Sequence, residues 1–210
     1  RETALPAAIR RFGLGVLHAP VAALPLRTSA ARIATIHDVP EFGKPGHEGL
    51  LSRNRLRLVH ALRAAARIIV PSVATRDAVL RMAPRIADRV VVIPHGVDPD
   101  FRPVGVSLQR ARYGIPPGPY LLSVGTIRPR KDPSVLVEAF ARLVHGGSTD
   151  LHLVLCGDLR MDADALRAPL RAAGLEDRLV LPGYVAREDL PDLYRESLVV
   201  VVPSRLEGFG

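Results

Sequence analysis

The chain has 210 residues, 48% hydrophobic and 24% charged, a composition that can build a core and excludes a disordered or fibrous protein. No stretch approaches the roughly 20 consecutive apolar residues of a membrane-spanning helix. Arg1 is not a start methionine followed by an apolar leader. Because the length is about 1.4 times that of a typical ~150-residue domain, we expect a soluble piece of a longer protein.

The net charge of +8 is unevenly distributed along the chain. Residues 1–100 contain 15 basic and 8 acidic side chains, whereas residues 101–210 contain 14 and 13. A basic half is typical of proteins that bind nucleic acid or an anionic membrane. Because only two of the 29 cations are lysines, a biased genome composition explains the charge equally well. Aromatic residues are only 4% of the chain, which argues against a protein that stacks single-stranded bases.

In the first half, short β-branched or apolar runs predict buried strands, and helical periodicity fills the intervals between them. Ser72 is placed to cap the second helix, since its hydroxyl can accept a backbone N–H. The predicted strands are 33–36, 67–70 and 89–93, and the predicted helices are 46–66 and 72–82. This alternation is typical of a parallel sheet with crossover helices.

Prolines crowd residues 94–119, where the only helical pattern is the brief segment 107–113. Proline stops both helices and sheet ladders. We therefore predict an interdomain linker over residues 99–119.

Beyond this linker the alternation of strands and helices resumes. The predicted strands are 120–124, 151–156, 178–181 and 198–202, and the predicted helices are 133–145, 162–173 and 187–196. Three strands in one half and four in the other are fewer than a full doubly wound fold has. We expect residues 1–98 to be the C-terminal part of one Rossmann-like α/β domain and residues 120–210 the N-terminal part of the next.

The loop after the first strand of the second half combines a glycine, cations and a helix start. Gly125 allows close backbone approach to a ligand, the helix beginning at Asp132-Pro133 offers unpaired N–H groups, and Arg130 with Lys131 adds positive charge. Such a loop can hold a pyrophosphate, although an ordinary strand-to-helix turn has the same spacing.

A second candidate loop follows the last predicted strand. Gly208, Phe209 and Gly210 can turn backbone amides toward a ligand, and the carboxylate of Glu207 can accept hydrogen bonds from sugar hydroxyls. In isolation the same residues could form a plain turn.

Taken together, the ordered motifs resemble the GT-B retaining glycosyltransferases of family four, and most closely the mannosyltransferase-like members. The second half carries Val-Gly-Thr-Ile-Arg-Pro-Arg-Lys-Asp, Leu-Pro-Gly-Tyr-Val, Asp-Leu-Pro-Asp-Leu-Tyr and Pro-Ser-Arg-Leu-Glu-Gly-Phe-Gly. The first half carries Thr-Ile-His-Asp, Ile-Val-Pro-Ser-Val-Ala-Thr-Arg-Asp and Val-Ile-Pro-His-Gly-Val-Asp in the family's order. The resemblance implies two Rossmann-like doubly wound domains, both incomplete here.

The resemblance also implies roles for individual residues. Arg130 and Lys131 match the family's diphosphate clamp, and Thr126 stands beside Gly125 where some members have an arginine. Glu207 matches the first glutamate of a paired-glutamate motif whose partner would fall eight residues further on. The residues with implied roles on the donor are Gly125, Thr126, Arg130, Lys131, Tyr184, Val185, Glu207, Gly208, Phe209 and Gly210, with Tyr184 and Val185 bordering the nucleobase.

His37 matches a histidine that faces the reacting sugar, and it also ends a predicted strand, where side chains meet ligands. With Arg130, Lys131 and Glu207 it completes the implied catalytic set. His95, in contrast, lies beside the predicted linker, and we interpret it as structural or hinge-associated.

Two further signals are interpreted as structural. Asp162 and Asp164 resemble a metal-binding Asp-x-Asp, but they open a predicted helix, where acidic residues meet the helix dipole favourably. The single cysteine, Cys156, ends a predicted buried strand without an evident base partner, and we interpret it as a core residue. We expect no metal and no other cofactor.

The implied activity is transfer of a hexose, with mannose favoured, from a nucleoside diphosphate sugar such as GDP-mannose to a polysaccharide or lipid-linked acceptor. We expect a cytoplasmic enzyme, with peripheral contact to the anionic inner membrane face as a secondary hypothesis. Two alternatives remain open: a nucleotide-sugar epimerase on the same fold, and a non-catalytic arginine-rich nucleic-acid binder, for which the glycine loops would have no use.

Overall fold

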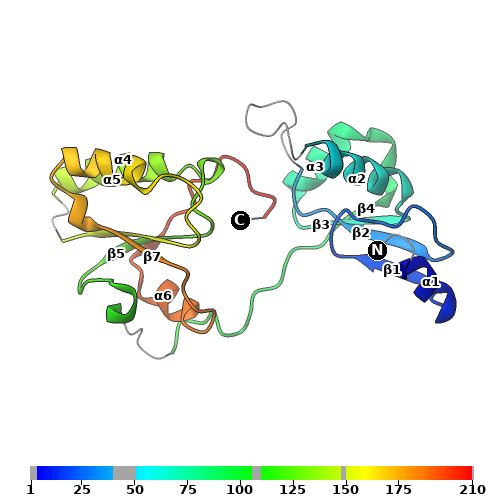
Figure 1. The fold of residues 1–210 in the computed structure, drawn as a ribbon, viewed down its shortest axis with the longest axis horizontal. Helices are drawn as coiled ribbons and strands as arrows, with labels where there is room; N and C mark the ends of the chain where they lie inside the picture. Colours follow the sequence, from blue (N-terminus) through cyan, green and yellow to red (C-terminus); the bar gives the residue numbers. More distant parts are fainter. Residues whose placement is uncertain (1–3, 40–50, 106–109, 148–149, 210) are drawn as a thin grey trace. The chain divides into compact units, whose positions relative to one another are not determined.

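The computed structural model describes residues 4–39, 51–105, 110–147 and 150–209. The contacts within the chain divide it into two units, one of residues 1–96 with 207–210 and one of residues 97–206. Each unit is a layered α/β structure around one parallel sheet (Figure 1).

The first unit has a four-stranded parallel sheet in the order β1-β2-β3-β4. Helices α2 and α3 cover one face of this sheet (Figure 1), and buried side chains such as Ala34, Leu62 and Ile68 form the core between the layers. The strands are β1 (Val16–Ala19), β2 (Ala31–Thr35), β3 (Arg67–Val70) and β4 (Val90–Val92). The helices are α1 (Ala4–Arg11), α2 (Leu51–Ala64), α3 (Val73–Met82) and the 3-10 helix η1 (Pro84–Arg89).

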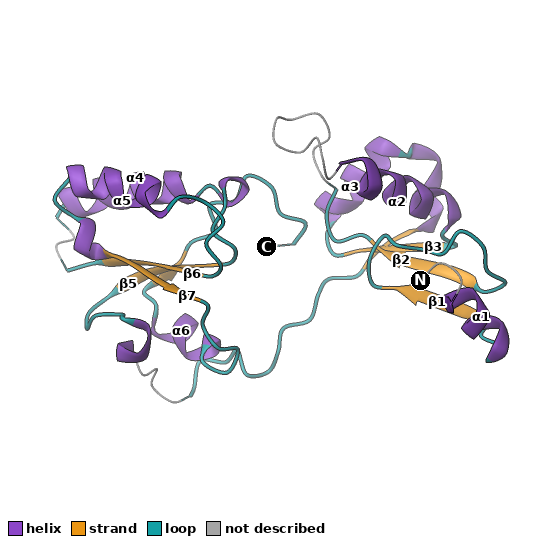
Figure 2. Ribbon diagram, in the orientation of Figure 1, coloured by secondary structure: helices purple, strands orange, loops and turns teal. Residues whose placement is uncertain are grey.

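The second unit has a four-stranded parallel sheet in the order β7-β6-β5-β8. Figure 2 shows the strands as a layer with helices on both sides. The strands are β5 (Tyr120–Val124), β6 (His152–Cys156), β7 (Leu179–Gly183) and β8 (Val199–Val200). The α-helices are α4 (Pro133–His145), α5 (Ala163–Ala172) and α6 (Leu190–Glu196), and the 3-10 helices are η2 (Arg110–Tyr113), η3 (Pro129–Lys131) and η4 (Glu176–Arg178).

Alternation along the strands gives the second unit a core on each face of its sheet. Leu121 packs with Phe140 of α4 and Leu170 of α5 on one face. Its neighbour Leu122 packs with Leu193 of α6 on the other. Both faces of a parallel sheet must be covered, and here the crossover helices cover them.

Most predicted elements of the second half match the structure closely, but parts of the chain differ from the predictions. The N-terminal residues with no predicted element form α1 and β1. Helix α6 begins at Leu190 rather than at residue 187, because the preceding residues turn, with the Asp189 N–H donating to the carbonyl of Ala186. The last strand is only Val199–Val200, and half of the Val199 side chain is exposed.

Part of the segment predicted as a linker packs on the second unit. Ile115 is buried in the core on the α6 face. Arg110 of η2 pairs with Glu196 at the end of α6, with 2.7 Å between Nε and Oε2. Residues 107–109 and residues 46–50, which belong to predicted helices, lie outside the described residues. Among the helices that the structure describes, none has the length and apolar character needed to cross a membrane.

Candidate functional site

The strand order of the second unit reverses at β5. The chain passes from β5 through α4 to β6 on one side, and it returns through α6 to place β8 on the other side of β5. Ligands of open parallel sheets bind beyond the carboxyl ends of the strands where the order reverses. The carboxyl ends of β5 and β8 therefore mark the expected site.

A small recess of about 30 Å³ lies at this point of the sheet. Its lining comes from the end of β5 with the loop that follows, from the start of α4, and from the chain beyond β8. The lining includes Gly125, Thr126 and Lys131 from the first predicted loop, with Pro203 and Ser204 from the chain just beyond β8. The structure thus brings the loop after β5 and the chain just beyond β8 together around one concave surface.

Glycines line the carboxyl edge of the sheet beside this recess. The Gly125 N–H donates to the carbonyl of Cys156, and the Gly157 N–H donates to the carbonyl of Gly183, each at 2.8 Å. Gly125, Gly157 and Gly183 all have positive φ, which other residues adopt only with strain. At Gly125 and Gly183 no atom of the described residues lies within 4 Å of the Cβ position, which leaves space beside the backbone, whereas at Gly157 the Gly125 carbonyl oxygen occupies that position.

Charged side chains connect the loop after β5 with the chain beyond β8, the two segments that border the recess. Nη1 of Arg130 donates to the carbonyl of Leu206 at 2.7 Å, and Nε of Arg205 donates to Oδ2 of Asp132 at 2.6 Å. The hydrogen bond to the Asp132 carboxylate raises the pKa of Arg205. Of the two predicted clamp residues, Lys131 lines the recess, whereas the guanidinium of Arg130 binds the carbonyl of Leu206, in the chain beyond β8.

Tyr184 and Val185 leave the same edge of the sheet at the end of β7. The Tyr184 side chain is 79% exposed, and that of Val185 is 2% exposed within the core on the α6 face. Tyr184 therefore offers an aromatic face to a ligand. The side chain of Val185 packs in the core, so this residue can offer a ligand only its backbone.

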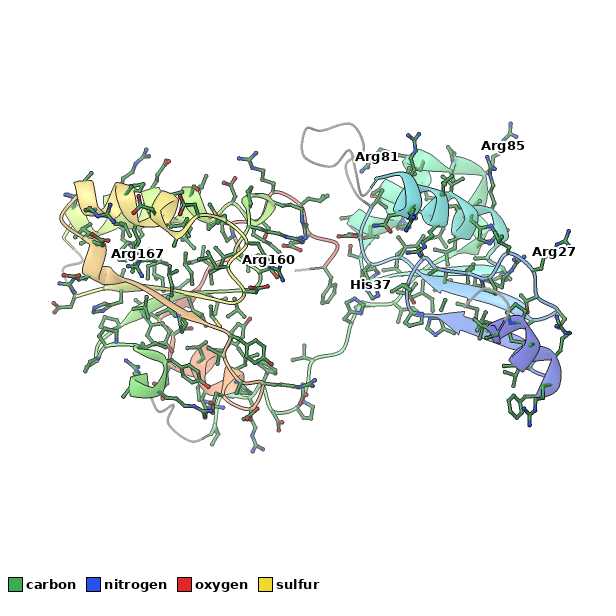
Figure 3. The ribbon with its side chains drawn as sticks, viewed as in Figure 1. Arg27, His37, Arg81, Arg85, Arg160 and Arg167 are labelled. Atoms are coloured by element: carbon green, nitrogen blue, oxygen red, sulfur yellow. The ribbon has the colours of Figure 1, made fainter. Side chains whose placement is uncertain are left out.

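His37 lies in the first unit, just beyond β2 (Figure 3), and pairs with His95. Nε2 of His37 is 2.8 Å from the carbonyl oxygen of Pro20, which can only accept, so Nε2 carries the proton and donates. Nδ1 of His37 lies within hydrogen-bond distance of Nε2 of His95, at 3.2 Å. Both ring nitrogens of His37 are thus engaged within the first unit, and His95 is its direct partner.

The residues after Leu206 group with the first unit. The hydroxyls of Ser72 and Thr75 both donate to the carbonyl oxygen of Gly208, at 2.6 and 2.9 Å. A Cβ at Gly208 would lie 1.7 Å from the carbonyl oxygen of His37, so this close approach requires glycine. The Phe209 ring meets that of His95 edge-on, with centroids 5.2 Å apart. Glu207 belongs to the same group, and Gly210 lies outside the described residues.

The Asp-x-Asp pair and the single cysteine, both interpreted from the sequence as structural, have structural positions. Asp162 caps α5, accepting the Asp164 N–H at 3.0 Å. Asp164 pairs with Arg171 at 2.9 Å. Cys156 is buried at the end of β6, and burial raises the pKa of its thiol.

Sequence reasoning missed Gly157 and Gly183, which lie with Gly125 at the carboxyl edge of the sheet. Each stands at the carboxyl end of a strand, as Gly125 does, and that position was the signal that could have found them. Arg160 was missed as well: its N–H donates to the carbonyl of Ile127 at 2.8 Å, which ties the loop after β6 to the loop after β5, and its side chain pairs with Asp158 (Figure 3).

Two protein-family models together match almost the whole chain. The model described as "Glycosyltransferase Family 4" matches residues 2–101, and the model described as "Glycosyl transferases group 1" matches residues 107–210. The chain belongs to this glycosyltransferase family. Its fold is GT-B, with the two Rossmann-like parts that the sequence predicts.

Curated relatives of this glycosyltransferase chain act on different sugars by name. An α-D-kanosaminyltransferase of Streptomyces kanamyceticus is 32% identical over 72% of the chain and 40% of the relative. The O-antigen chain mannosyltransferase B of Escherichia coli is 30% identical over 97% of the chain and 54% of the relative. The solved structure of sucrose-phosphate synthase from Thermosynechococcus elongatus superposes with a TM-score of 0.73 at 24% identity, over 100% of the chain and 55% of that protein. The chain thus spans about half the length of these relatives.

Proposed function

We propose that the protein transfers a hexose from a nucleoside diphosphate sugar to a saccharide or lipid-linked acceptor, with retention at the anomeric carbon. The observation that carries this proposal is the recess where the strand order reverses, lined by Gly125, Thr126 and Lys131. Backbone N–H groups and a cation at such a point suit a diphosphate.

In the proposed reaction the bond between the sugar C1 and the diphosphate oxygen breaks, and a bond forms from C1 to the acceptor hydroxyl oxygen on the same face. The acceptor proton passes to the phosphate oxygen that leaves. Negative charge grows on the diphosphate as it departs, so Lys131 contributes more in the transition state than in the ground state. We assign this charge stabilisation to Lys131 and Arg130 and propose transfer without a metal.

We favour mannose, as in GDP-mannose, because a relative that aligns with 97% of the chain is a mannosyltransferase by name. Tyr184 and Val185 are assigned to the nucleobase, since Tyr184 is an exposed aromatic side chain at the same edge of the sheet as the recess. Glu207, Gly208, Phe209 and Gly210 are assigned to the sugar, and His37 to its reacting face.

A peripheral contact with anionic lipid is part of the proposal for the acceptor. Exposed arginines on α2 and around α3 project from the first unit, as Figure 3 shows for Arg81 and Arg85. Each basic side chain near an anionic membrane surface contributes about 1 kcal/mol of attraction.

The test is Lys131→Ala in the full-length protein, assayed with GDP-mannose for transfer product and released nucleotide. Loss of one group that stabilises transition-state charge lowers kcat/KM by about 100-fold or more. Arg142→Ala, an exposed cation in the last turn of α4, is the matched control and leaves kcat/KM unchanged. Undiminished transfer by the Lys131 variant would contradict the clamp, and an isomerised nucleotide sugar as the product would indicate an epimerase.

A further inference from the structure

The loop between β7 and α6 is held at both ends by one tyrosine. The hydroxyl of Tyr113, in η2, donates to Oδ2 of Asp189, and the Tyr113 hydroxyl oxygen accepts from the Ala186 N–H at 3.4 Å. Arg112 donates to the same Asp189 oxygen at 2.9 Å. Tyr113 thus joins two points of the loop that lie three residues apart.

A neighbouring ion pair ties the same loop to the start of the second unit. Nη2 of Arg187 donates to Oδ2 of Asp98 at 2.8 Å, and the backbone N–H of Asp100 donates to the same side chain at 3.1 Å. These hydrogen bonds lower the pKa of Asp98, so the pair is charged at neutral pH. The Arg187 side chain is strongly exposed, and an exposed ion pair of this kind contributes little to stability. The half-buried Tyr113 contact is the stronger of the two attachments.

Tyr113 is suited to act as a fixed donor. Its ring packs against the core on the α6 face. Burial, and after it the hydrogen bond to Asp189, raises the pKa of the phenol, so the hydroxyl keeps its proton at neutral pH. A donor to a carboxylate makes a stronger hydrogen bond than one between neutral groups.

The position of the loop matters because Tyr184 precedes it. Val185 is fixed in the core and α6 begins at Leu190, so the residues between them have their conformation set by the contacts of Ala186 and Asp189. We propose that Tyr113 is a positioning residue that holds this loop, through Ala186 and Asp189, so that Tyr184 meets the nucleobase of the donor. This role rests on the proposed function, because it requires a nucleotide at the carboxyl edge of the sheet.

The test separates the nucleobase from the diphosphate. UDP and GDP are titrated against the full-length protein by calorimetry, together with inorganic pyrophosphate, and the tighter nucleotide is used for the variants. Tyr113→Phe keeps the ring and removes the hydroxyl. Nucleotide affinity falls by about 5- to 10-fold, the equivalent of one hydrogen bond, while pyrophosphate affinity stays within about twofold. Lys131→Ala weakens both ligands.

Tyr120→Phe is the matched control. Its buried hydroxyl donates to the carbonyl of Leu193 in α6 and has no part in the loop. This variant lowers the melting temperature and leaves both affinities unchanged. Arg112→Gln, at an exposed side chain, lowers nucleotide affinity by a smaller factor than Tyr113→Phe. This second variant tests the same contact with Asp189 if Tyr113→Phe fails to fold.

In kinetics, Tyr113→Phe raises KM for the donor with little change in kcat, since the contact is made equally in the ground and transition states. Equal nucleotide affinity in wild type and Tyr113→Phe would overturn the positioning role alone. A parallel loss of pyrophosphate affinity would also overturn it, because the effect would then not be specific to the base. A wild-type protein that binds none of the three ligands would overturn the proposed function itself.

Discussion

At Gly157 the chain leaves β6 with a φ of +139°, and a Cβ there would lie 2.2 Å from the carbonyl oxygen of Gly125. Two constraints therefore act on one residue. The backbone conformation is strained for any side chain, and the neighbouring loop occupies the space that a methyl group would need. Gly125, which lines the recess, keeps its position only while residue 157 remains a glycine.

We predict that Gly157→Ala destabilises the second unit and weakens ligand binding at the recess. Gly147 is the matched control, since it also has a left-handed φ of +118° but no atom within 4 Å of its Cβ position. Gly147→Ala costs about 1 kcal/mol from strain alone. Gly157→Ala costs about 1 to 3 kcal/mol more because of the clash. Urea denaturation measures both, and equal costs would contradict the close approach.

His152, at the start of β6, makes the stability of the second unit depend on pH. Its Nδ1 is buried and has no hydrogen-bond partner among the described residues. Burial, and then the positive charge of Arg178, lowers the pKa of the imidazole. The folded state therefore disfavours the protonated ring, and the unfolded chain binds the proton more readily.

The sign of this effect gives a prediction. Because the pKa of His152 is lower in the folded state, its burial costs no stability at pH values above the pKa of the unfolded chain, near 6.5. The folded state loses stability as the pH falls below that pKa. Wild-type protein should lose stability between about pH 7 and pH 5, and His152→Leu should lose less over the same interval. Chemical denaturation at several pH values measures the slopes. Equal slopes in the two proteins would contradict the assignment.

At the scale of elements, the strands and helices with strong local signals could be predicted. Helix α4 begins at Pro133, where proline suits the first turn, and it ends before Gly146, as the sequence indicates. Ser72 caps α3 as predicted, accepting the Thr75 N–H at 3.1 Å. Strand β1 was missed because an exposed edge strand of four residues lacks the continuous apolar run of a buried strand.

The candidate site could be predicted only in part, because some of its geometry depends on contacts between distant residues. Gly125 and Lys131 follow a recognisable strand, and the structure places both at the recess. The prolines in residues 99–119 led to the prediction of a linker, so the burial of Ile115 in the second unit was not predicted. The contact between Tyr113 and Asp189 joins residues 76 positions apart, and no local pattern contains it.

At the scale of the whole molecule, each unit has a core of its own. Ile68 is fully buried in the core of the first unit, and Leu153 is fully buried in that of the second. The four tyrosines, Tyr113, Tyr120, Tyr184 and Tyr194, all belong to the second unit, and the chain has no tryptophan. Tyrosine fluorescence of the 210-residue chain therefore reports on one unit, while far-ultraviolet circular dichroism reports on both.

This distribution allows the separate cores to be tested. Leu153→Ala should destabilise the second unit by about 2 to 5 kcal/mol and shift the fluorescence transition to lower urea. Ile68→Ala should destabilise the first unit by a similar amount, which shifts part of the dichroism signal and leaves the fluorescence transition in place. Two separate cores unfold as two cooperative transitions, since each buries its own apolar surface. A fluorescence midpoint that moves equally in both variants would show that the units unfold as one.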